Sequence, residues 1–144
     1  MTRFVLDYSV AISWCMLDES NAQAEAILDL LAEDSEAVVP WIFWLEIVNC
    51  FLVSERRGRL TEANVSEGLA MLRALRIVVD ANTTQESINT TWELGRQYNL
   101  AAYDAAYLEL AIREGLLLAT IDNKLAEAAR DCDVLLTIPR EDVT

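Results

Sequence analysis

The chain has 144 residues, of which 53% are hydrophobic, 24 are Asp or Glu and 11 are Lys or Arg, giving a formal net charge of −13. It contains no histidine, which excludes Ser-His-Asp and Cys-His nucleophiles and the usual zinc sites, so hydrolytic chemistry would have to rest on carboxylates. The excess of acid argues against a nucleic-acid binder that works through a basic surface of its own.

In chain order, apolar runs and helical patterns alternate through the first half of the sequence. They predict a strand at Arg3–Leu6, a helix at Val10–Leu17, a helix after Ser20, a strand at Ala37–Val39, a helix at Trp41–Glu55, a helix from Thr61 and a strand at Arg76–Val79. Ser9 is placed to cap the first helix, and Ser20 with Gln23 forms a capping-box pattern before the second. The Trp41–Glu55 segment is so dense in aromatic and aliphatic residues that we predict a mostly buried helix.

The second half continues the alternation. It predicts a helix behind a capping box of Thr83 and Glu86, a helix at Ala102–Glu114 that Gly115 ends, a strand at Leu116–Ile121, a helix at Asn123–Arg130 and a last strand at Asp133–Leu136. Because the Leu116–Ile121 strand is apolar, we place it in the middle of a parallel sheet. We predict an α/β fold, a three-layer α/β/α sandwich around a central parallel sheet of four to five strands, with residues 1–144 forming one domain.

The three cysteines, Cys15, Cys50 and Cys132, are widely spaced and lie in apolar segments, so we interpret them as core thiols of a protein in a reducing compartment. The first apolar run stops at Asp7, too early for a signal peptide. The longest apolar run, Ala37 to Leu45, falls far short of a membrane span. We therefore expect a soluble, cytoplasmic protein with no membrane contact.

Four carboxylates stand in apolar segments where a charge is not expected: Asp7, Glu46, Asp104 and Asp122. Burying an unpaired charge costs several kcal/mol or more, so a buried acid needs a partner that offsets the cost. Asp7 and Asp122 follow predicted strands, and ligands of parallel sheets bind beyond the carboxyl ends of the strands. A cluster of carboxylates without His or Cys favours Mg²⁺ or Mn²⁺, and two such ions can support displacement at a phosphodiester.

Each acid also has a plainer interpretation. Asp7 and Asp122 could simply cap the helices that follow them. Glu46 could be a partly exposed helix acid, and Asp104 an acid favoured by the helix dipole. The occurrence of all four in nearly charge-free segments favours a shared metal site.

Other candidate residues are also open to two interpretations. Ser9 and Thr120 each lie two residues from an acid, where they could orient a carboxylate, or serve as a helix cap and an ordinary strand residue. The basic cluster at Arg56, Arg57 and Arg59 could hold an RNA phosphate backbone or be a solvated helix end. Trp41, Phe43 and Trp44 cannot all face one core, so one of them could lie at a partner surface.

Four segments in this order resemble the motifs of PIN-domain ribonucleases. They are Phe4–Val10 (FVLDYSV), Trp44–Asn49 (WLEIVN), Tyr103–Ala111 (YDAAYLELA) and Ala119–Leu125 (ATIDNKL). They extend over most of the chain at the family's usual spacing. The size and motif style are most similar to the toxins of VapBC toxin–antitoxin pairs.

The resemblance implies a Mg²⁺- or Mn²⁺-dependent endoribonuclease with one or two ions per site, acting on an RNA such as tRNA or rRNA. It implies an acidic catalytic and metal-binding site of Asp7, Glu46, Asp104 and Asp122, supported by Ser9, Thr120 and Asn123. Metal-activated water would attack the phosphodiester and leave a 5′-phosphate and a 3′-hydroxyl. It further implies a homodimer, and an antitoxin protein that inhibits by placing a segment, often basic, near the acids.

Two positions depart from the family pattern: Ala101 stands where the toxins often have Thr or Ser, and Asn123 where some relatives have a further acid. The main alternative is a catalytically silent PIN-like module that mainly binds a protein partner, which the acidic charge would suit. A phosphatase acting on small phosphoesters ranks last, because Ser9 occupies the second position of the Asp-x-Asp arrangement that nucleophilic aspartate enzymes tend to use.

Overall fold

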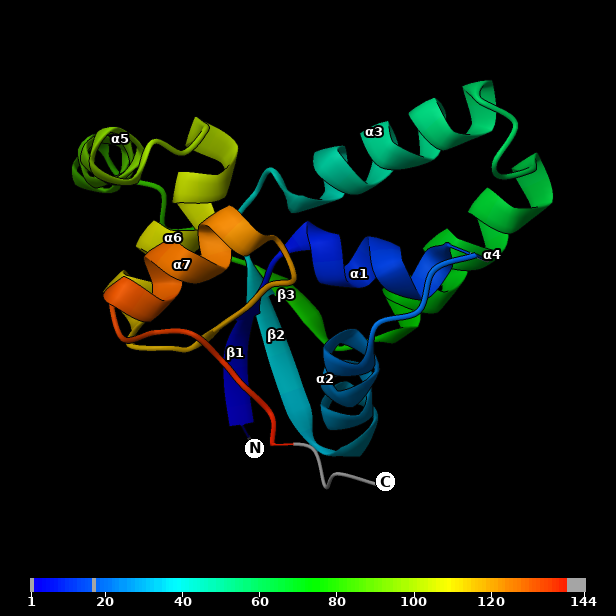
Figure 1. Ribbon diagram of the computed structural model, residues 1–144, viewed down its shortest axis with the longest axis horizontal. Helices are drawn as coiled ribbons and strands as arrows, with labels where there is room; N and C mark the ends of the chain where they lie inside the picture. Colours follow the sequence, from blue (N-terminus) through cyan, green and yellow to red (C-terminus); the bar gives the residue numbers. More distant parts are fainter. Residues whose placement is uncertain (1, 17, 140–144) are drawn as a thin grey trace.

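The computed structural model describes residues 2–16 and 18–139, shown in Figure 1. In chain order the elements are β1 (Thr2–Leu6), α1 (Tyr8–Cys15), α2 (Ala22–Glu33), β2 (Ser35–Val39), α3 (Phe43–Arg56), α4 (Glu62–Ala74), β3 (Ile77–Val79), α5 (Gln85–Tyr98), α6 (Ala102–Glu114), β4 (Leu118–Ala119) and α7 (Asn123–Asp131). No helix in these described ranges has the length and apolar character needed to cross a membrane.

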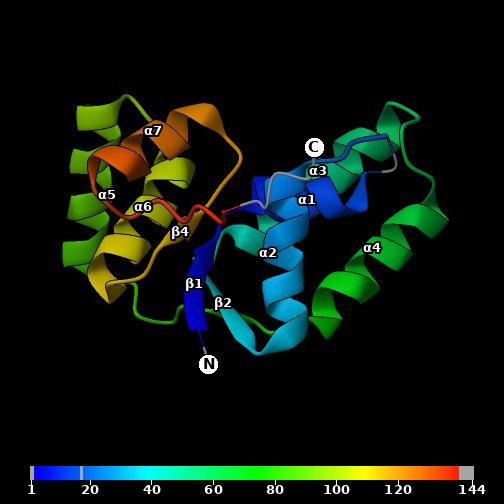
Figure 2. The same ribbon diagram turned by 60° about the horizontal axis from the view of Figure 1, so that its bottom comes forward.

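The four strands form one parallel sheet in the order β3-β2-β1-β4. Figure 2 shows α1–α4 on one side of the sheet and α5–α7 on the other. The chain moves from β1 through β2 to β3 in one direction and then returns to the far side of β1, which takes its last helices to the opposite face. The predicted three-layer α/β/α sandwich is confirmed.

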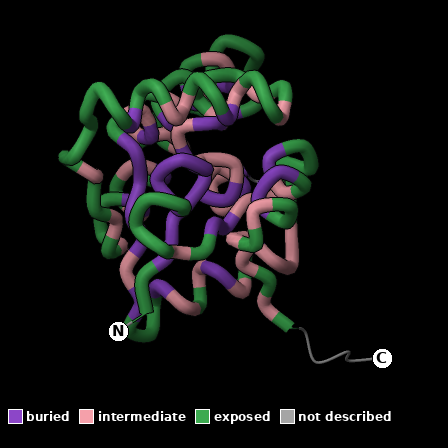
Figure 3. Tube along the Cα trace, turned by 90° about the vertical axis from the view of Figure 1, so that its left-hand side faces the viewer, coloured by how far each residue is buried: buried purple, intermediate pink, exposed green. Residues whose placement is uncertain are grey.

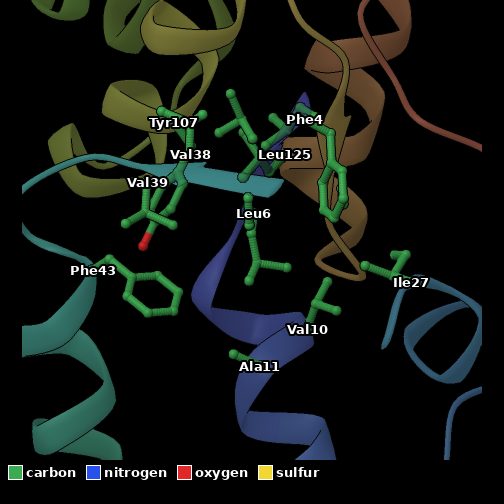
Figure 4. Close-up of a cluster of buried hydrophobic side chains, with 14 of the residues drawn as sticks. Phe4, Leu6, Val10, Ala11, Ile27, Val38, Val39, Phe43, Tyr107 and Leu125 are labelled. Carbon is green, nitrogen blue, oxygen red and sulfur yellow. The ribbon is translucent and has the colours of Figure 1, made fainter. Parts of the chain in front are cut away.

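The core lies where the two helical layers meet the central strands. Phe4, Leu6 and Val39 are at most 1% exposed, and the close-up in Figure 4 places Val10 of α1 and Tyr107 of α6 in the same cluster. Figure 3 shows the same distribution along the chain, with buried segments in the middle and exposed segments on the outer helices. Because both faces of a parallel sheet are covered, its central strands are apolar on both sides, which is why Phe4–Leu6 of β1 and Ala37–Val39 of β2 are continuous hydrophobic runs.

The predicted central position of the Leu116–Ile121 strand is wrong. β4 is only two residues long and lies at the end of the four-stranded order, with a single parallel bridge from Leu118 to Leu135 beyond it. The chain leaves the sheet after Ala119, and the Thr120 hydroxyl then donates a hydrogen bond to Asp7. The predicted last strand at Asp133–Leu136 is therefore reduced to this one bridge.

Three helix starts also differ from the prediction. Ser9 lies inside α1, while α2 is capped by Asn21, whose side chain accepts from the Ala24 amide, in place of Ser20. The capping box before α5 is formed by Thr84 and Ser87, one residue after the predicted pair. Neighbouring Ser, Thr and Asn residues have similar capping chemistry, so the local sequence does not choose between them. The predicted end of the first helix, Leu17, lies outside the described residues.

Two boundaries are confirmed. Thr61 caps α4 with a complete capping box. The Ala102–Glu114 helix has the predicted bounds and ends at Gly115, which adopts a left-handed conformation with φ +64°. A residue without a β-carbon takes this conformation at little cost, which makes glycine a reliable helix stop.

The prediction that the third helix is mostly buried is wrong. Phe43, Ile47 and Phe51 are buried on one side of α3. The opposite side leaves Leu45 59% exposed and Val48 and Leu52 41% exposed. Hydrophobic density in a sequence predicts burial but does not distinguish a core from a surface that meets a partner.

Candidate functional site

The site is built around the carboxyl end of β1. Asp7 is the first residue after this strand, and its backbone amide donates to the carbonyl of Ala119, the last residue of β4, at 2.9 Å. β1 has β2 on one side and β4 on the other, so the strand order reverses here. In open parallel sheets this switch point is where ligands bind.

Asp7 is 1% exposed, and its two carboxylate oxygens have different surroundings. Oδ2 accepts hydrogen bonds from the hydroxyls of Ser9 at 2.6 Å and Thr120 at 2.8 Å. Oδ1 is buried without a hydrogen-bond partner among the described residues. Although Asp7 occupies the N-cap position of α1, it makes no side-chain capping bond to that described helix, so the capping interpretation is wrong for Asp7.

Burial raises the pKa of Asp7 to about 6. The hydrogen bonds from Ser9 and Thr120 oppose this shift, and the nearby charges of Asp104 and Asp122 add to it. The carboxylate is thus ionised at neutral pH at a cost to the fold, which a bound cation would offset.

Glu46 lies in the first turn of α3 and is partly buried. The hydroxyl of the fully buried Tyr107 donates to Glu46 Oε1 at 2.7 Å. Burial raises the pKa of Glu46 to about 7; the Tyr107 hydrogen bond lowers it, while Asp7 and Asp104 raise it further.

Asp104 and Asp122 lie closer to solvent. Asp104 is in the first turn of α6, and burial followed by the charge of Asp122 raises its pKa, with Lys124 acting in the opposite direction. Asp122 is exposed and caps α7, because its Oδ1 accepts from the Leu125 amide at 2.9 Å. The capping interpretation is correct for Asp122, and it leaves the second carboxylate oxygen for another ligand.

The four acids interact through their charges, because Asp7, Glu46 and Asp104 each have a pKa raised by at least one other member. The structure therefore brings the predicted set together. Within residues 2–16 and 18–139, no three acidic or thiol side chains are positioned to hold a metal ion as they stand. The fit to a hard cation rests instead on the buried Asp7 Oδ1, the all-oxygen donors and the mutual repulsion.

The predicted supporting residues divide into two groups. Ser9 and Thr120 both contact Asp7, and Thr120 Oγ1 also accepts from the Asp122 amide at 3.1 Å, which links two of the acids. Asn123 is exposed, its side chain makes no hydrogen bond with the acids of the described chain, and it lines a recess of about 330 Å³ together with Thr120, Gln23 and Arg130.

The predicted RNA-binding arginines lie at the far end of α3. Arg56 and Arg57 are exposed, and Arg57 lines a recess that contains Asn49 and Cys50. The same Asn49 and Cys50 line the cavity at Glu46, so the two recesses adjoin at these residues. Arg59 pairs with Asp18 and Glu19 at 3.3 and 3.1 Å.

Two residues at the site are absent from the predicted set. The sequence contains an indication for Tyr107. It follows Asp104 by three residues, so the two side chains lie on the same face of α6, one helical turn apart. The sequence also contains an indication for Lys124, because it is the only lysine of the sequence and directly follows Asp122 and Asn123.

Comparison with known proteins gives consistent results. The family model of the PIN domain matches residues 4–131. Two curated proteins, both named Ribonuclease VapC3, are similar. The one from Pyrobaculum aerophilum is 27% identical over 125 residues, covering 87% of this chain and 93% of the relative. The one from Mycobacterium tuberculosis is 31% identical over 118 residues, covering 73% of this chain and 83% of the relative.

Two solved structures have a similar fold. PAE2754 from Pyrobaculum aerophilum superposes with a TM-score of 0.68 at 18% identity, covering 88% of this chain and 84% of that one. A toxin–antitoxin complex from Klebsiella pneumoniae contains a chain that superposes with a TM-score of 0.57 at 19% identity, covering 84% of this chain and 88% of that one.

Proposed function

The chain belongs to the PIN-domain family and to its VapC type, and on this basis we propose that it is the ribonuclease toxin of a toxin–antitoxin pair. It cleaves RNA phosphodiester bonds at the site formed by Asp7, Glu46, Asp104 and Asp122. The single observation that carries the proposal is the buried Asp7 Oδ1 at the switch point of the sheet. The names of the two curated relatives support it.

We further propose that the reaction depends on Mg²⁺ or Mn²⁺, held by these four carboxylates as one or two ions. Bound there, a divalent cation supplies a Lewis acid that makes water a better nucleophile and neutralises charge on the phosphate. Burial and repulsion, which raise the pKa of Asp7 and Glu46 in the protein alone, favour binding of such an ion.

The other side chains of the site orient the acids. Ser9 and Thr120 fix Asp7 Oδ2 and leave Oδ1 without a hydrogen bond from the described residues, and Tyr107 fixes Oε1 of Glu46. Such outer contacts set the direction and basicity of metal ligands. The recess at Arg57, which adjoins the cavity at Glu46, would receive the RNA strand on one side of the cleavage point.

We propose an antitoxin partner because of the acidic charge of the chain as well as its family. A chain with net charge −13 would attract a basic antitoxin segment, which could lie against the exposed acids. The complex from Klebsiella pneumoniae supports an antitoxin partner. Since the substrate would be a cellular RNA such as tRNA or rRNA, we place the reaction in the cytoplasm.

The decisive experiment incubates the purified chain with total RNA in Mg²⁺, in Mn²⁺ and with a chelator. Discrete fragments with 5′-phosphate ends that form only with metal are the expected result. If no RNA is cut with either metal, the nuclease proposal fails and a silent partner-binding module becomes the better interpretation. Equal cutting with and without chelator would reject the metal dependence alone.

The Tyr107→Phe variant is expected to bind Mn²⁺ roughly 10–100-fold more weakly than wild type, because Glu46 loses the hydroxyl that orients it. Calorimetric titration of the purified protein with Mn²⁺ measures this directly. Tyr98→Phe is the matched control, since it removes a 2.7 Å hydrogen bond to Asp131 instead. Equal affinities in the two variants would contradict a role for Tyr107 in positioning Glu46.

The Lys124→Met variant is expected to lower kcat/KM for RNA cleavage by roughly 10–100-fold, the loss that follows when one charge-assisted contact to phosphate is removed. Lys124→Arg should retain most of the activity. Arg130→Met removes an exposed cation from the same helix and serves as the control. Wild-type activity of Lys124→Met would show that its charge does not assist the substrate.

A further inference from the structure

The cavity at Glu46 has aromatic walls that the mechanism above does not use. It measures about 390 Å³, and the first turns of α1, α3 and α6 contribute Tyr8, Glu46 and Tyr103 to its lining. Figure 1 shows α1 lying beside α3, which brings two of these turns together. Ligand pockets in proteins commonly measure roughly 300–1,000 Å³, so this cavity is large enough for one nucleobase.

The cavity borders the four carboxylates of the candidate active site. Glu46 belongs to both, since it is one of the acids and also lines the cavity. Tyr8 directly follows Asp7, and Tyr103 directly precedes Asp104. Burial raises the pKa of Tyr8 to about 12, and charges on neighbouring groups, among them three of the four acids, add to this shift. A group bound in the cavity would therefore lie next to a phosphate held at the acids.

The charge of the cavity selects an uncharged occupant. Glu46 is its only carboxylate, and no Lys or Arg of the described chain lines it. An RNA phosphate would be repelled there, whereas a nucleobase is neutral and planar. The adjoining recess has the opposite character, because it contains the exposed Arg57. The two recesses thus suit the two parts of a nucleotide, its base and its phosphate.

Three polar side chains at the cavity are available to a ligand. Among the described residues, none forms a hydrogen bond with the hydroxyls of Tyr8 and Tyr103 or with the side-chain amide of Asn49. The Asn amide offers both a donor and an acceptor, so it can form two hydrogen bonds with the edge of one base. Apolar walls with a few such polar groups are the usual construction of a binding pocket.

We propose that this cavity binds one unpaired RNA base next to the cleaved phosphodiester, an inference that rests on the proposed ribonuclease function. Tyr103, which is 59% exposed, provides the ring on which the base stacks, and Tyr8 forms the wall toward Asp7. Asn49 pairs with the edge of the base. Proteins recognise single-stranded RNA by this combination of aromatic stacking and hydrogen bonds to base edges.

The base site determines which RNA is cut. A base inside a double helix is stacked and paired, so it cannot enter the cavity, and cleavage should occur in loops and single strands and not in stems. Stacking on tyrosine discriminates little among the four bases. The sequence preference at this position should therefore come from Asn49, and Asn49→Ala should relax it.

Cleavage kinetics on a short single-stranded RNA test the proposal. Tyr103→Leu is expected to raise KM by roughly 5–100-fold with little change in kcat, whereas Tyr103→Phe, which keeps the ring, should cleave like wild type. Tyr8→Leu and Tyr8→Phe form a second pair of the same design. The control is Trp92→Leu, which removes an exposed aromatic ring outside the cavity. Calorimetric titration with Mn²⁺ should give the wild-type affinity in each variant, which shows that the neighbouring acids remain in place.

An abasic ribose tests the same contact from the side of the substrate. RNAs that lack one base, at each position in turn around the cleaved bond, are compared in wild type and Tyr103→Leu. Loss of the base at one position should raise KM for wild type as much as Tyr103→Leu does, and should change KM for the variant little further, because ring and base make one contact. If neither the leucine variants nor any abasic position changed KM, the base site would be rejected and the nuclease would stand.

A binding measurement separates this proposal from the nuclease. Fluorescence anisotropy follows a labelled single-stranded RNA of about six nucleotides as it binds Asp7→Asn in Mg²⁺, with and without the added Tyr103→Leu change. Weaker binding by the double variant, and equal binding of an abasic RNA by both proteins, is the expected result. If RNA binds in this way but wild type cuts none, the nuclease proposal fails and the base site stands. Neither binding nor cleavage would overturn both proposals.

Discussion

The Asp7→Asn variant is expected to lose RNA cleavage by about 10³-fold or more in kcat, since removing a ligand charge from a metal site forfeits several kcal/mol of transition-state stabilisation. Asn has the same size as Asp, and its side-chain oxygen can still accept the hydrogen bonds that the hydroxyls of Ser9 and Thr120 donate. At the position of Asp7 Oδ1 it puts an amide group, which repels a cation. The loss should therefore come from chemistry and not from a changed backbone.

Cleavage of total RNA by wild type and variant at matched concentrations measures this effect. Asp29→Asn, which changes an exposed acid on α2, is the control for net charge and should cleave like wild type. Fragments from Asp7→Asn at a rate near that of wild type would remove Asp7 from the active site. The nuclease assignment would then have to rest on other residues.

The metal-free protein is expected to lose stability as the pH rises from about 4 to 7. Burial raises the pKa of Asp7 from an ordinary 3.8 to about 6 and that of Glu46 from 4.5 to about 7. A carboxyl group with a raised pKa binds its proton more tightly in the folded state, so its contribution is present at low pH and is lost as it ionises. For Asp7, which is 1% exposed, the loss amounts to about 3 kcal/mol.

Urea denaturation in a chelator, repeated between pH 4 and 8, measures this change. The difference in unfolding free energy between wild type and Asp7→Asn should change by about 2 kcal/mol across pH 4–6, with wild type the less stable protein at pH 7.5. Saturating Mn²⁺ at pH 7.5 should stabilise wild type much more than the variant. If the unfolding free energies of the two proteins changed with pH in parallel, ionisation of Asp7 would not destabilise the folded state.

The sequence predicts the site better than it predicts the surface around it. Each acid could be identified because a charge interrupts an apolar segment, and Ser9 and Thr120 could be identified from their spacing to Asp7 and Asp122. The contact between Tyr107 and Glu46 joins residues 61 positions apart, and no local pattern specifies such a pairing. The edge position of β4 was mispredicted for a similar reason, because the order of strands in a sheet depends on pairing between distant segments.

The exposed side of α3 was mispredicted for a different reason. The exposed stripe of α3 consists of the same residue types as a core stripe: Leu45, Val48 and Leu52. A hydrophobic pattern is the same whether the apolar neighbour belongs to the same chain or to another. Only the fold distinguishes the two cases. The sequence did contain one indication, since three aromatic residues at positions 41, 43 and 44 cannot all face one interior.

The hydrogen bond between Thr120 and Asp7 spans 113 residues of sequence. On a ribosome, Asp7 is made 113 residues before Thr120, and Asp122 follows Thr120. A nascent chain therefore cannot assemble the acidic site until the segment with Thr120 and Asp122 has been translated. A nuclease built in this way would be inactive until that segment has been made, so an inhibitor would be needed only from that point on.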